Sequence, residues 1–309
     1  MGFFSPGGYH MFYGIYTAII TPFRSGKVDE KKLEELVTYQ VEAGVQGVVP
    51  CGTTGEFLYL SPSEQKRIIE ICAGVCKGKA HVIAGTGALS TEDTITQTRE
   101  AQKAGATAAL IVNPWYVKPS QESLYQYYKK ISDRVDLPII IYNNPSRTGV
   151  DMTFDTLSRL ASCSKIQGYK DSSSNLIRIS ELKGQLGDRF SLLAGNDEPF
   201  AAFLGMGGDG AIMVGSNVAP QLFVDIMKCW QKGDLPQFQA LWKKGFPLLL
   251  ALCQESNPAP IKYAMSLVHG VSLESRLPFA PLKDATQKAI QEALKVLGLW
   301  KPLDSVRER

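Results

Sequence analysis

The stretch HVIAGTGALSTEDTITQTREAQKAGATAALIV, residues 81–112, holds the pattern that decides the fold. It begins with a short apolar run at 81–85, continues with a helical pattern at 90–105, and ends in a second apolar run at 106–112. Short apolar runs fit buried strands, and a helix between two of them is the usual connection of parallel strands. The stretch therefore predicts a strand–helix–strand unit.

The same pattern recurs along most of the chain. Apolar runs followed by helical segments occupy residues 16–20, 46–50, 81–85, 106–112, 137–142, 164–170, 191–195 and 209–215. Eight strand-then-helix units predict an α/β protein with a closed (β/α)8 TIM barrel. An open doubly wound sheet is the alternative, because alternation alone does not show closure. Against it, the GTGALS turn at 85–90 lacks the third glycine of a dinucleotide-binding loop.

The 309 residues divide into three predicted parts. Residues 1–12 form an N-terminal extension whose role stays open, with Met11 as a candidate natural start. Residues 13–233 form the catalytic barrel. Residues 234–309 form a C-terminal helical region, because they carry three further helical patterns and no strand pattern.

Composition excludes several classes of partner. The 33 basic and 30 acidic residues are spread along the chain, so no basic stripe predicts nucleic-acid binding. No apolar run approaches the roughly 20 residues of a membrane span, and the N-terminus lacks a basic leader. The six cysteines lack both C-x-x-C spacing and disulfide-scaffold density. We therefore expect a cytoplasmic protein with reduced thiols, no nucleic-acid partner and no membrane partner.

Reactive side chains follow particular strands of the predicted barrel, where the active site of this fold lies. They are Thr53 and Thr54 after strand two, Tyr116 after strand four, Tyr142 and Arg147 after strand five, and Lys170 at the end of strand six. The three histidines lie far apart in sequence and none belongs to a metal-ligand pair. We therefore predict no metal and no Ser-His-Asp arrangement.

Lys170 is the candidate nucleophile. A lysine after a strand is usually a solvated surface charge, because lysine is rarely buried unpaired. If Lys170 points inward among apolar layers, burial favours a neutral amine that can attack a carbonyl and form a Schiff base. Asp171 would then point the opposite way, provided that the strand continues, and the amine would lack an adjacent carboxylate.

Schiff-base chemistry also needs proton carriers, and hydroxyl groups both donate and accept protons. Tyr142 is otherwise a strand-end aromatic of the core, and the pair Thr53 and Thr54 is otherwise a turn and helix cap. Arg147 is otherwise a surface residue. In its short turn between Pro145 and Gly149, its guanidinium can bind a carboxylate in bidentate fashion.

Together, CGTTGE (51–56), YNNPSRTG (142–149) and the strand-six lysine resemble the class I pyruvate-dependent aldolases, the family of dihydrodipicolinate synthase and N-acetylneuraminate lyase. The resemblance extends from about Tyr13 to Lys301. The segments ESNPAPIK (255–262) and SRLPFAPL (275–282) are similar to the tail of the synthase branch.

The resemblance implies a role for each candidate residue. The implied catalytic residues are Lys170, which condenses with pyruvate, and the proton-relay residues Tyr142, Thr53 and Tyr116. The implied substrate-binding residues are Thr54, Arg147, Ile212 through its backbone, and Gly195. No cofactor is implied beyond the covalent Schiff base on Lys170. In the family the equivalent of Tyr116 comes from a neighbouring subunit, which implies a homo-oligomer, commonly a tetramer built as a dimer of dimers.

In the synthase branch pyruvate condenses with L-aspartate 4-semialdehyde to give 4-hydroxy-tetrahydrodipicolinate, in lysine and diaminopimelate biosynthesis, and Arg147 would grip the semialdehyde carboxylate. The nearest alternative is a lyase of the same family acting on another aldehyde. Examples are N-acetylneuraminate lyase and the 2-keto-3-deoxy sugar acid aldolases. The KDSS pattern at 170–173 resembles the pattern of the branches that act on 2-keto-3-deoxy sugar acids. A non-catalytic keto-acid sensor is a third reading, although it would not need the relay hydroxyls.

Four positions bear on regulation by L-lysine. Trp115, Pro62, Gln65 and Leu89 stand where lysine-inhibited synthases tend to have Tyr, His, His and Asn. The resemblance therefore predicts an enzyme insensitive to L-lysine.

Overall fold

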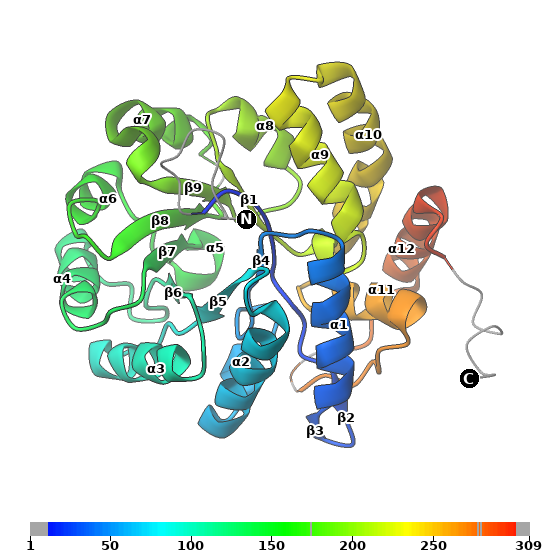
Figure 1. Cartoon of the computed structure of the whole chain (residues 1–309), viewed down its shortest axis with the longest axis horizontal. Helices are drawn as coiled ribbons and strands as arrows, with labels where there is room; N and C mark the ends of the chain where they lie inside the picture. Colours follow the sequence, from blue (N-terminus) through cyan, green and yellow to red (C-terminus); the bar gives the residue numbers. More distant parts are fainter. Residues whose placement is uncertain (1–11, 174, 277, 279, 301–309) are drawn as a thin grey trace.

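The computed structural model describes residues 12–173, 175–276, 278 and 280–300, and its strands form a closed parallel barrel (Figure 1). The barrel strands are β1 (Gly14–Thr17), β4 (Gly47–Val48), β5 (His81–Gly85), β6 (Ala108–Val112), β7 (Ile139–Asn143), β8 (Ile166–Asp171), β9 (Ser191–Ala194) and β10 (Gly210–Met213). β1 pairs with both β4 and β10, which closes the sheet. The predicted TIM barrel is confirmed, and the open-sheet alternative is excluded.

Helices surround the strands in a ring (Figure 1). They are α1 (Glu30–Glu42), α2 (Pro62–Cys76), α3 (Thr91–Lys103), α4 (Gln121–Ser132), α6 (Phe154–Leu160), α7 (Ile177–Leu186), α8 (Phe200–Gly205) and α9 (Pro220–Lys232). Side-chain caps fix the starts of several of them. Ser61 and Glu64 form the predicted capping box at the start of α2, where each side chain bonds the backbone of the other.

The C-terminal region adds α10 (Leu235–Leu252), α11 (Ala259–His269) and α12 (Asp284–Leu297). Helix α10 packs against α9 and α12 on the outside of the barrel (Figure 1). Within the part of this region that the structure describes there is no strand, as the sequence predicted. Most of the predicted extension (residues 1–11) and the last residues of the helical region (301–309) lie outside the described residues.

The sequence patterns missed several short elements. A small antiparallel hairpin, β2 (Phe23–Arg24) and β3 (Lys27–Val28), lies between β1 and α1. A one-turn helix, α5 (Pro145–Thr148), carries the candidate arginine. The 3₁₀ turns are η1 (Phe57–Tyr59), η2 (Gly187–Arg189) and η3 (Gly215–Asn217). These elements are too short to give a recognisable apolar period.

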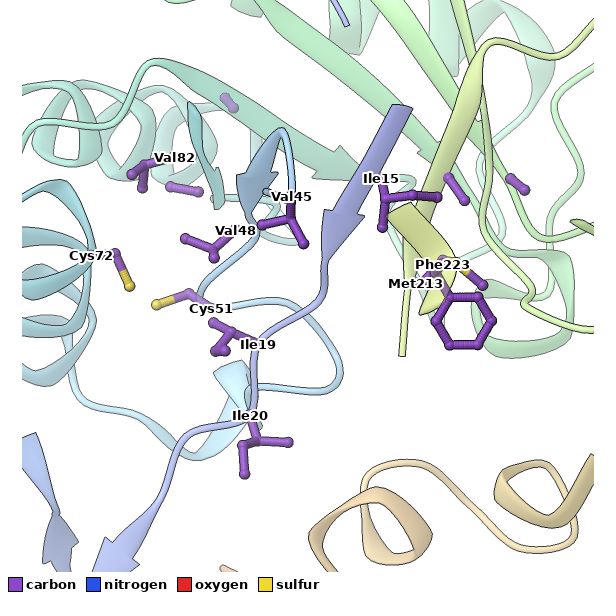
Figure 2. Packing of buried hydrophobic residues seen from close by; sticks show 14 of the residues in the cluster. Ile15, Ile19, Ile20, Val45, Val48, Cys51, Cys72, Val82, Met213 and Phe223 are labelled. Atoms are coloured by element: carbon purple, nitrogen blue, oxygen red, sulfur yellow. The ribbon is translucent and has the colours of Figure 1, made fainter. Parts of the chain in front are cut away.

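Alternate side chains of each strand enter two separate cores. Tyr16 and Ile212 belong to the cluster inside the barrel, whereas Ile15 and Met213 belong to the layer between the strands and the helices. Figure 2 shows this outer layer, in which Met213 lies beside Phe223 of α9. The residue that ends each strand therefore has a side fixed by the alternation.

One end of the barrel is filled by an aromatic cluster. Phe12 is fully buried there, its ring lies 6.3 Å from that of Tyr16 and 5.8 Å from that of His81, and its backbone N–H donates to Ser191 Oγ at 3.1 Å. Phe12 was assigned to the extension by sequence, but it packs as part of the barrel. In the described part of the chain, no helix has the length and apolar character needed to cross a membrane.

Candidate active site

A cavity of about 530 Å³ lies at the C-terminal ends of the strands. Six of the eight sequence-predicted site residues line it, namely Thr53, Thr54, Tyr142, Arg147, Lys170 and Gly195. They come from four different strand-to-helix loops or strand ends, which the closed barrel brings around one opening.

Lys170 faces the cavity from inside the barrel. It is the second-to-last residue of β8 and is only 6% exposed. It lies in register with Tyr142 on β7 and Leu193 on β9. Its Nζ lies 4.1 Å from the centroid of the Tyr142 ring. The side chain is therefore a buried amine against an aromatic face, not a solvated surface charge.

Tyr142 is held by hydrogen bonds to its hydroxyl. Asn144 Nδ2 donates to that hydroxyl oxygen at 2.8 Å, and Ser172 Oγ lies within 3.4 Å of it. Burial alone would raise the pKa of Tyr142, but the Lys170 charge, these two hydrogen bonds and the Arg147 charge outweigh it and lower the pKa below its ordinary value. A phenol of lowered pKa gives up and recovers a proton more readily, which suits it to proton transfer.

The two threonines lie in a tight loop after β4, residues 51–56, which we call the threonine loop. Gly55 N–H and Phe57 N–H both donate to Gly52 O, at 3.1 and 3.3 Å, so the backbone doubles back at the threonine pair. Thr54 is 3% exposed, and its Oγ1 accepts a hydrogen bond from Asn257 Nδ2 at 2.9 Å. The loop therefore places both threonines in the cavity lining, and Asn257 holds the Thr54 hydroxyl there.

Gly195 permits a close approach between strand ends. A Cβ added there would lie 2.2 Å from Ser172 Oγ and 2.8 Å from Asp171 O. Both contacts are shorter than real Cβ atoms tolerate, so a side chain at this position would displace the end of β8. The glycine is required by packing next to Lys170.

Asp197 is a cavity residue that the sequence patterns missed. Its carboxylate is 5% exposed and accepts hydrogen bonds from Val214 N–H at 3.0 Å and Gly215 N–H at 2.6 Å. Burial raises the pKa of Asp197 to about 6, although these N–H groups and the Lys170 charge oppose the shift. The carboxylate thus ties the end of β9 to the turn after β10. The GND sequence that follows β9 was the available signal, since it occupies a strand end.

Other cavity residues missed by sequence are Asn144, Glu198 and Asn257. Asn144 follows β7 directly, so its position at a strand end was a usable signal. Asn257 lies between α10 and α11, outside the strand-and-helix repeat, and no local pattern predicts that it reaches the cavity.

Asp171 points away from the cavity, as predicted for the residue after an inward lysine. Its Oδ1 accepts hydrogen bonds from Asn143 Nδ2 at 3.1 Å and from the Tyr169 hydroxyl at 3.2 Å. Ser173 Oγ donates to its Oδ2 at 2.7 Å. Neither Asp171 nor Ser173 lines the cavity.

Two predicted residues do not line the cavity of the single chain. Tyr116 is 88% exposed and has a φ of 73°, so the loop holds it outward in a conformation that is uncommon for a non-glycine residue. Ile212 is fully buried within the barrel, and Val214 lines the cavity two residues further on. Among the described residues, no group of three or more His, Cys, Asp or Glu side chains could hold a metal ion.

Residues 11–297 match the dihydrodipicolinate synthetase family. The chain belongs to this family. It is 45% identical to the 4-hydroxy-tetrahydrodipicolinate synthase of Rhodospirillum centenum, over 94% of this chain and 99% of that protein.

Solved structures of the dihydrodipicolinate synthetase family share the fold. The dihydrodipicolinate synthase of Thermotoga maritima has a TM-score of 0.91 and 39% identity, over 94% of this chain and 100% of that chain. The chloride-inhibited dihydrodipicolinate synthase of Acinetobacter baumannii, complexed with pyruvate, has a TM-score of 0.89 and 39% identity, over 93% of this chain and 99% of that chain.

Proposed function

We propose that this chain is a Schiff-base-forming lyase that condenses pyruvate with L-aspartate 4-semialdehyde to 4-hydroxy-tetrahydrodipicolinate, a reaction of lysine and diaminopimelate biosynthesis. The observation that carries the proposal is the buried Lys170 amine, which faces the Tyr142 ring in a cavity that also contains hydroxyl groups and an arginine. The name of the Rhodospirillum centenum relative and the pyruvate complex of the Acinetobacter baumannii relative support it.

The reaction begins on pyruvate. The lone pair of Lys170 Nζ attacks C2 of pyruvate, and the carbinolamine that forms loses water to give an iminium ion. The Thr54 hydroxyl and the backbone at the end of β10, near Ile212, bind the pyruvate carboxylate. The Tyr142 hydroxyl, with Thr53 as relay, supplies the proton that leaves with water. The lysine amine provides the covalent catalysis, so the chemistry needs no metal or organic cofactor.

The second half of the reaction joins the two substrates. The iminium ion loses a proton from C3 of pyruvate, and the resulting enamine attacks the aldehyde carbon of the semialdehyde, whose oxygen takes up a proton. The amine of that substrate then attacks C2 and displaces Lys170, which closes the ring and frees the enzyme. The single water released is the one lost from the carbinolamine, so the atoms balance.

Asp171 and Ser173 of the KDSS pattern do not weigh against this substrate, whereas Ser172 lies within 3.4 Å of the Tyr142 hydroxyl, at the proposed proton carrier. Asp171 and Ser173 belong to the hydrogen-bond network outside the barrel, so their side chains do not touch a ligand in the cavity. The pocket residue that bears on the aldehyde is Arg147. It lies exposed at the rim on α5, and its guanidinium forms no hydrogen bond or ion pair with a described residue. An open guanidinium at this place fits a second substrate with a carboxylate.

Two assays separate the candidate substrates. The purified protein is expected to consume pyruvate when L-aspartate 4-semialdehyde is present, and to release little pyruvate from 2-keto-3-deoxy sugar acids or N-acetylneuraminate. Rapid release of pyruvate from a sugar acid, without consumption in the presence of the semialdehyde, would favour the alternative lyase. Absence of both activities, with pyruvate bound, would favour a keto-acid sensor.

Replacing Arg147 with alanine is expected to raise KM for the semialdehyde about 100-fold, because a charge-assisted bidentate contact to its carboxylate is lost. The half-saturating concentration of pyruvate should stay unchanged. Steady-state kinetics with each substrate varied in turn measures the split. Arg147→Lys serves as the matched control and should recover only part of the loss, since lysine cannot bind in bidentate fashion. Equal losses for both substrates would contradict the assignment.

We also propose that the active unit is a homo-oligomer in which Tyr116 reaches the pocket of a neighbouring chain, with a tetramer built from two dimers. Tyr116 is 88% exposed and Val117 is 67% exposed, so the loop tip carries large apolar side chains in water. The Phe57 and Trp115 rings meet 5.9 Å apart, which brings this loop beside a second one that exposes Leu58. Such neighbouring apolar side chains suit a subunit contact.

Mixing two defective chains tests the shared site. Tyr116→Phe is expected to slow turnover about 100-fold by removing a proton-relay hydroxyl, and Lys170→Ala to stop it. A mixed dimer would contain one pocket with the intact Lys170 of one chain and the intact Tyr116 of the other. Activity should therefore recover on mixing, once native mass spectrometry confirms that chains have exchanged. No recovery after exchange would place Tyr116 in its own chain's site.

We further propose that L-lysine does not regulate the enzyme. Gln65 donates its side-chain amide to Phe57 O at 3.1 Å and Leu89 is 51% exposed, while neither Pro62 nor Leu89 offers a polar side-chain atom. Initial rates are expected to change less than about twofold at millimolar L-lysine, because ligands for its ammonium and carboxylate groups are missing. Strong inhibition at sub-millimolar L-lysine would contradict this.

The cytoplasm is the proposed compartment, where the six free thiols would stay reduced.

A further inference from the structure

Three sequence motifs meet in one buried ionic cluster beside the active site. Glu56 ends the CGTTGE motif, Lys262 ends ESNPAPIK, and Arg276 lies in SRLPFAPL. Lys262 Nζ forms an ion pair with Glu56 Oε1 and donates to Glu274 O at 2.9 Å, and the Arg276 backbone N–H donates to Glu56 Oε2 at 2.9 Å. We call Glu56, Lys262 and Arg276 the ionic cluster.

The ionic cluster is sealed from water at its centre. Glu56 is 2% exposed and Lys262 is 1% exposed. Both cations lie over the ring of Phe23, with Lys262 Nζ 4.4 Å and the Arg276 guanidinium carbon 4.5 Å from the ring centroid. Burial lowers the pKa of Lys262, and the Glu56 carboxylate opposes that shift. Each charge depends on its partner, because an unpaired charge at this depth would be strongly unfavourable.

Arg276 extends the ionic cluster to a neighbouring helix. Its guanidinium donates to both carboxylate oxygens of Glu64, at 2.9 and 2.5 Å, and to Gly26 O at 3.2 Å. Glu64 caps the start of α2, the helix that follows the threonine loop. The ionic cluster therefore fixes both the end of the threonine loop and the element that comes after it.

The same C-terminal segment contacts the threonine loop at two residues, Glu56 and Thr54. Glu56 has a φ of 57°, and its backbone N–H donates to Thr53 O at 3.1 Å, so the residue whose carboxylate pairs with Lys262 also closes the turn that carries the threonines. A left-handed conformation in a non-glycine residue persists only where its surroundings hold it. Asn257, on the loop before α11, donates to Thr54 Oγ1 at 2.9 Å.

We propose that the Glu56–Lys262–Arg276 cluster is a positioning device for the Thr53 and Thr54 hydroxyls of the pyruvate site. This inference rests on the proposed function. Because Thr54 Oγ1 already accepts a hydrogen bond from Asn257, its own proton is left to point elsewhere and can be donated to a pyruvate carboxylate. A donor held in place before the ligand arrives contributes more than one that must be ordered on binding.

The test compares a single and a double substitution by borohydride trapping across a range of pyruvate concentrations. Lys262→Met, which leaves Glu56 without its ion-pair partner, is expected to raise the half-saturating pyruvate concentration at least about tenfold and to lower Tm. Glu56→Gln/Lys262→Met replaces the ion pair by neutral side chains of similar size. The double variant should regain most of the lost Tm, because no charge is left buried without a partner. It should keep the raised half-saturating concentration of pyruvate, because no ion pair then joins the threonine loop to α11.

A matched control breaks an ion pair at the other end of the barrel. Lys183 Nζ lies 2.9 Å from Asp209 Oδ1, and Asp209 is 5% exposed immediately before β10. The same Nζ also lies 2.9 Å from Oδ1 of Asp188, a surface residue. Lys183→Met should lower Tm without changing the half-saturating concentration of pyruvate. Full recovery of pyruvate affinity in the double variant, or unchanged affinity in Lys262→Met, would overturn the inference. If wild type itself failed to trap pyruvate, the proposed function would fall instead, so the two failures are distinguishable.

Discussion

Replacing Lys170 with alanine is expected to lower kcat by about 10⁴-fold or more, because in the proposed mechanism Lys170 alone forms the covalent bond to pyruvate. The fold should survive the change. The side chain is 6% exposed and its Nζ lies 4.1 Å from the centroid of the Tyr142 ring. The buried Asp197 carboxylate, which the Lys170 charge influences, keeps its two backbone N–H donors when the lysine is removed. Consumption of pyruvate in the presence of L-aspartate 4-semialdehyde measures the rate, and Tm from a thermal scan measures the fold.

Lys165→Ala is the matched control for this experiment. Lys165 comes just before the same strand, its side chain is 37% exposed, and its Nζ donates to Asp136 O at 3.2 Å on the surface. Its removal should leave kcat within about twofold, as is usual for surface positions. If Lys170→Ala kept more than about a tenth of wild-type kcat, another group would have to be the nucleophile, because covalent catalysis contributes far more than that.

Replacing Tyr142 with phenylalanine is expected to lower kcat about 10²- to 10⁴-fold, the usual contribution of a positioned general acid or base. The hydroxyl is the only group removed, and the ring, whose centroid lies 4.1 Å from Lys170 Nζ, remains. Asn144 Nδ2 loses its acceptor, so a small loss of Tm is also expected. Rapid-quench borohydride trapping should reveal slower Schiff-base formation, which locates the defect in proton transfer and not in binding.

Tyr169→Phe provides the comparison for Tyr142→Phe. Tyr169 is buried like Tyr142, but its hydroxyl donates to Asp171 Oδ1 at 3.2 Å in the layer outside the barrel. This variant should lose thermal stability and keep kcat within a few-fold of wild type. The assignment of Tyr142 as proton carrier would be wrong if the two variants lost activity equally.

The barrel could be predicted from sequence because its signal is repeated and local. Each strand is a short apolar run and each helix an amphipathic one, so eight repetitions compensate for uncertain boundaries. The boundaries themselves were less accurate. The first strand was expected at 16–20 and is found at Gly14–Thr17, since Ala18, Ile19 and Ile20 are buried in the loop that follows it. An apolar run reports burial, and burial does not require strand pairing.

The candidate site could be predicted where its residues stand directly at strand ends, as Lys170 and Tyr142 do. The orientation of Asp171 followed from alternation, but its network with Asn143 and Tyr169 could not be read from sequence. Asn257 could not be found either. It contacts Thr54 across 203 positions of sequence, from the ESNPAPIK segment, whose resemblance to the synthase branch does not say what Asn257 touches. Contacts of that kind are set by tertiary packing, on which local periodicity carries no information.

Borohydride reduction in the presence of pyruvate, followed by intact mass and peptide mapping, tests the central claim most directly. The protein should gain the mass of one reduced pyruvyl group per chain, and the modified peptide should carry it on Lys170. The Lys170→Ala variant should gain nothing under the same conditions. A wild-type protein without an adduct, or an adduct that persists in Lys170→Ala, would contradict the proposed mechanism.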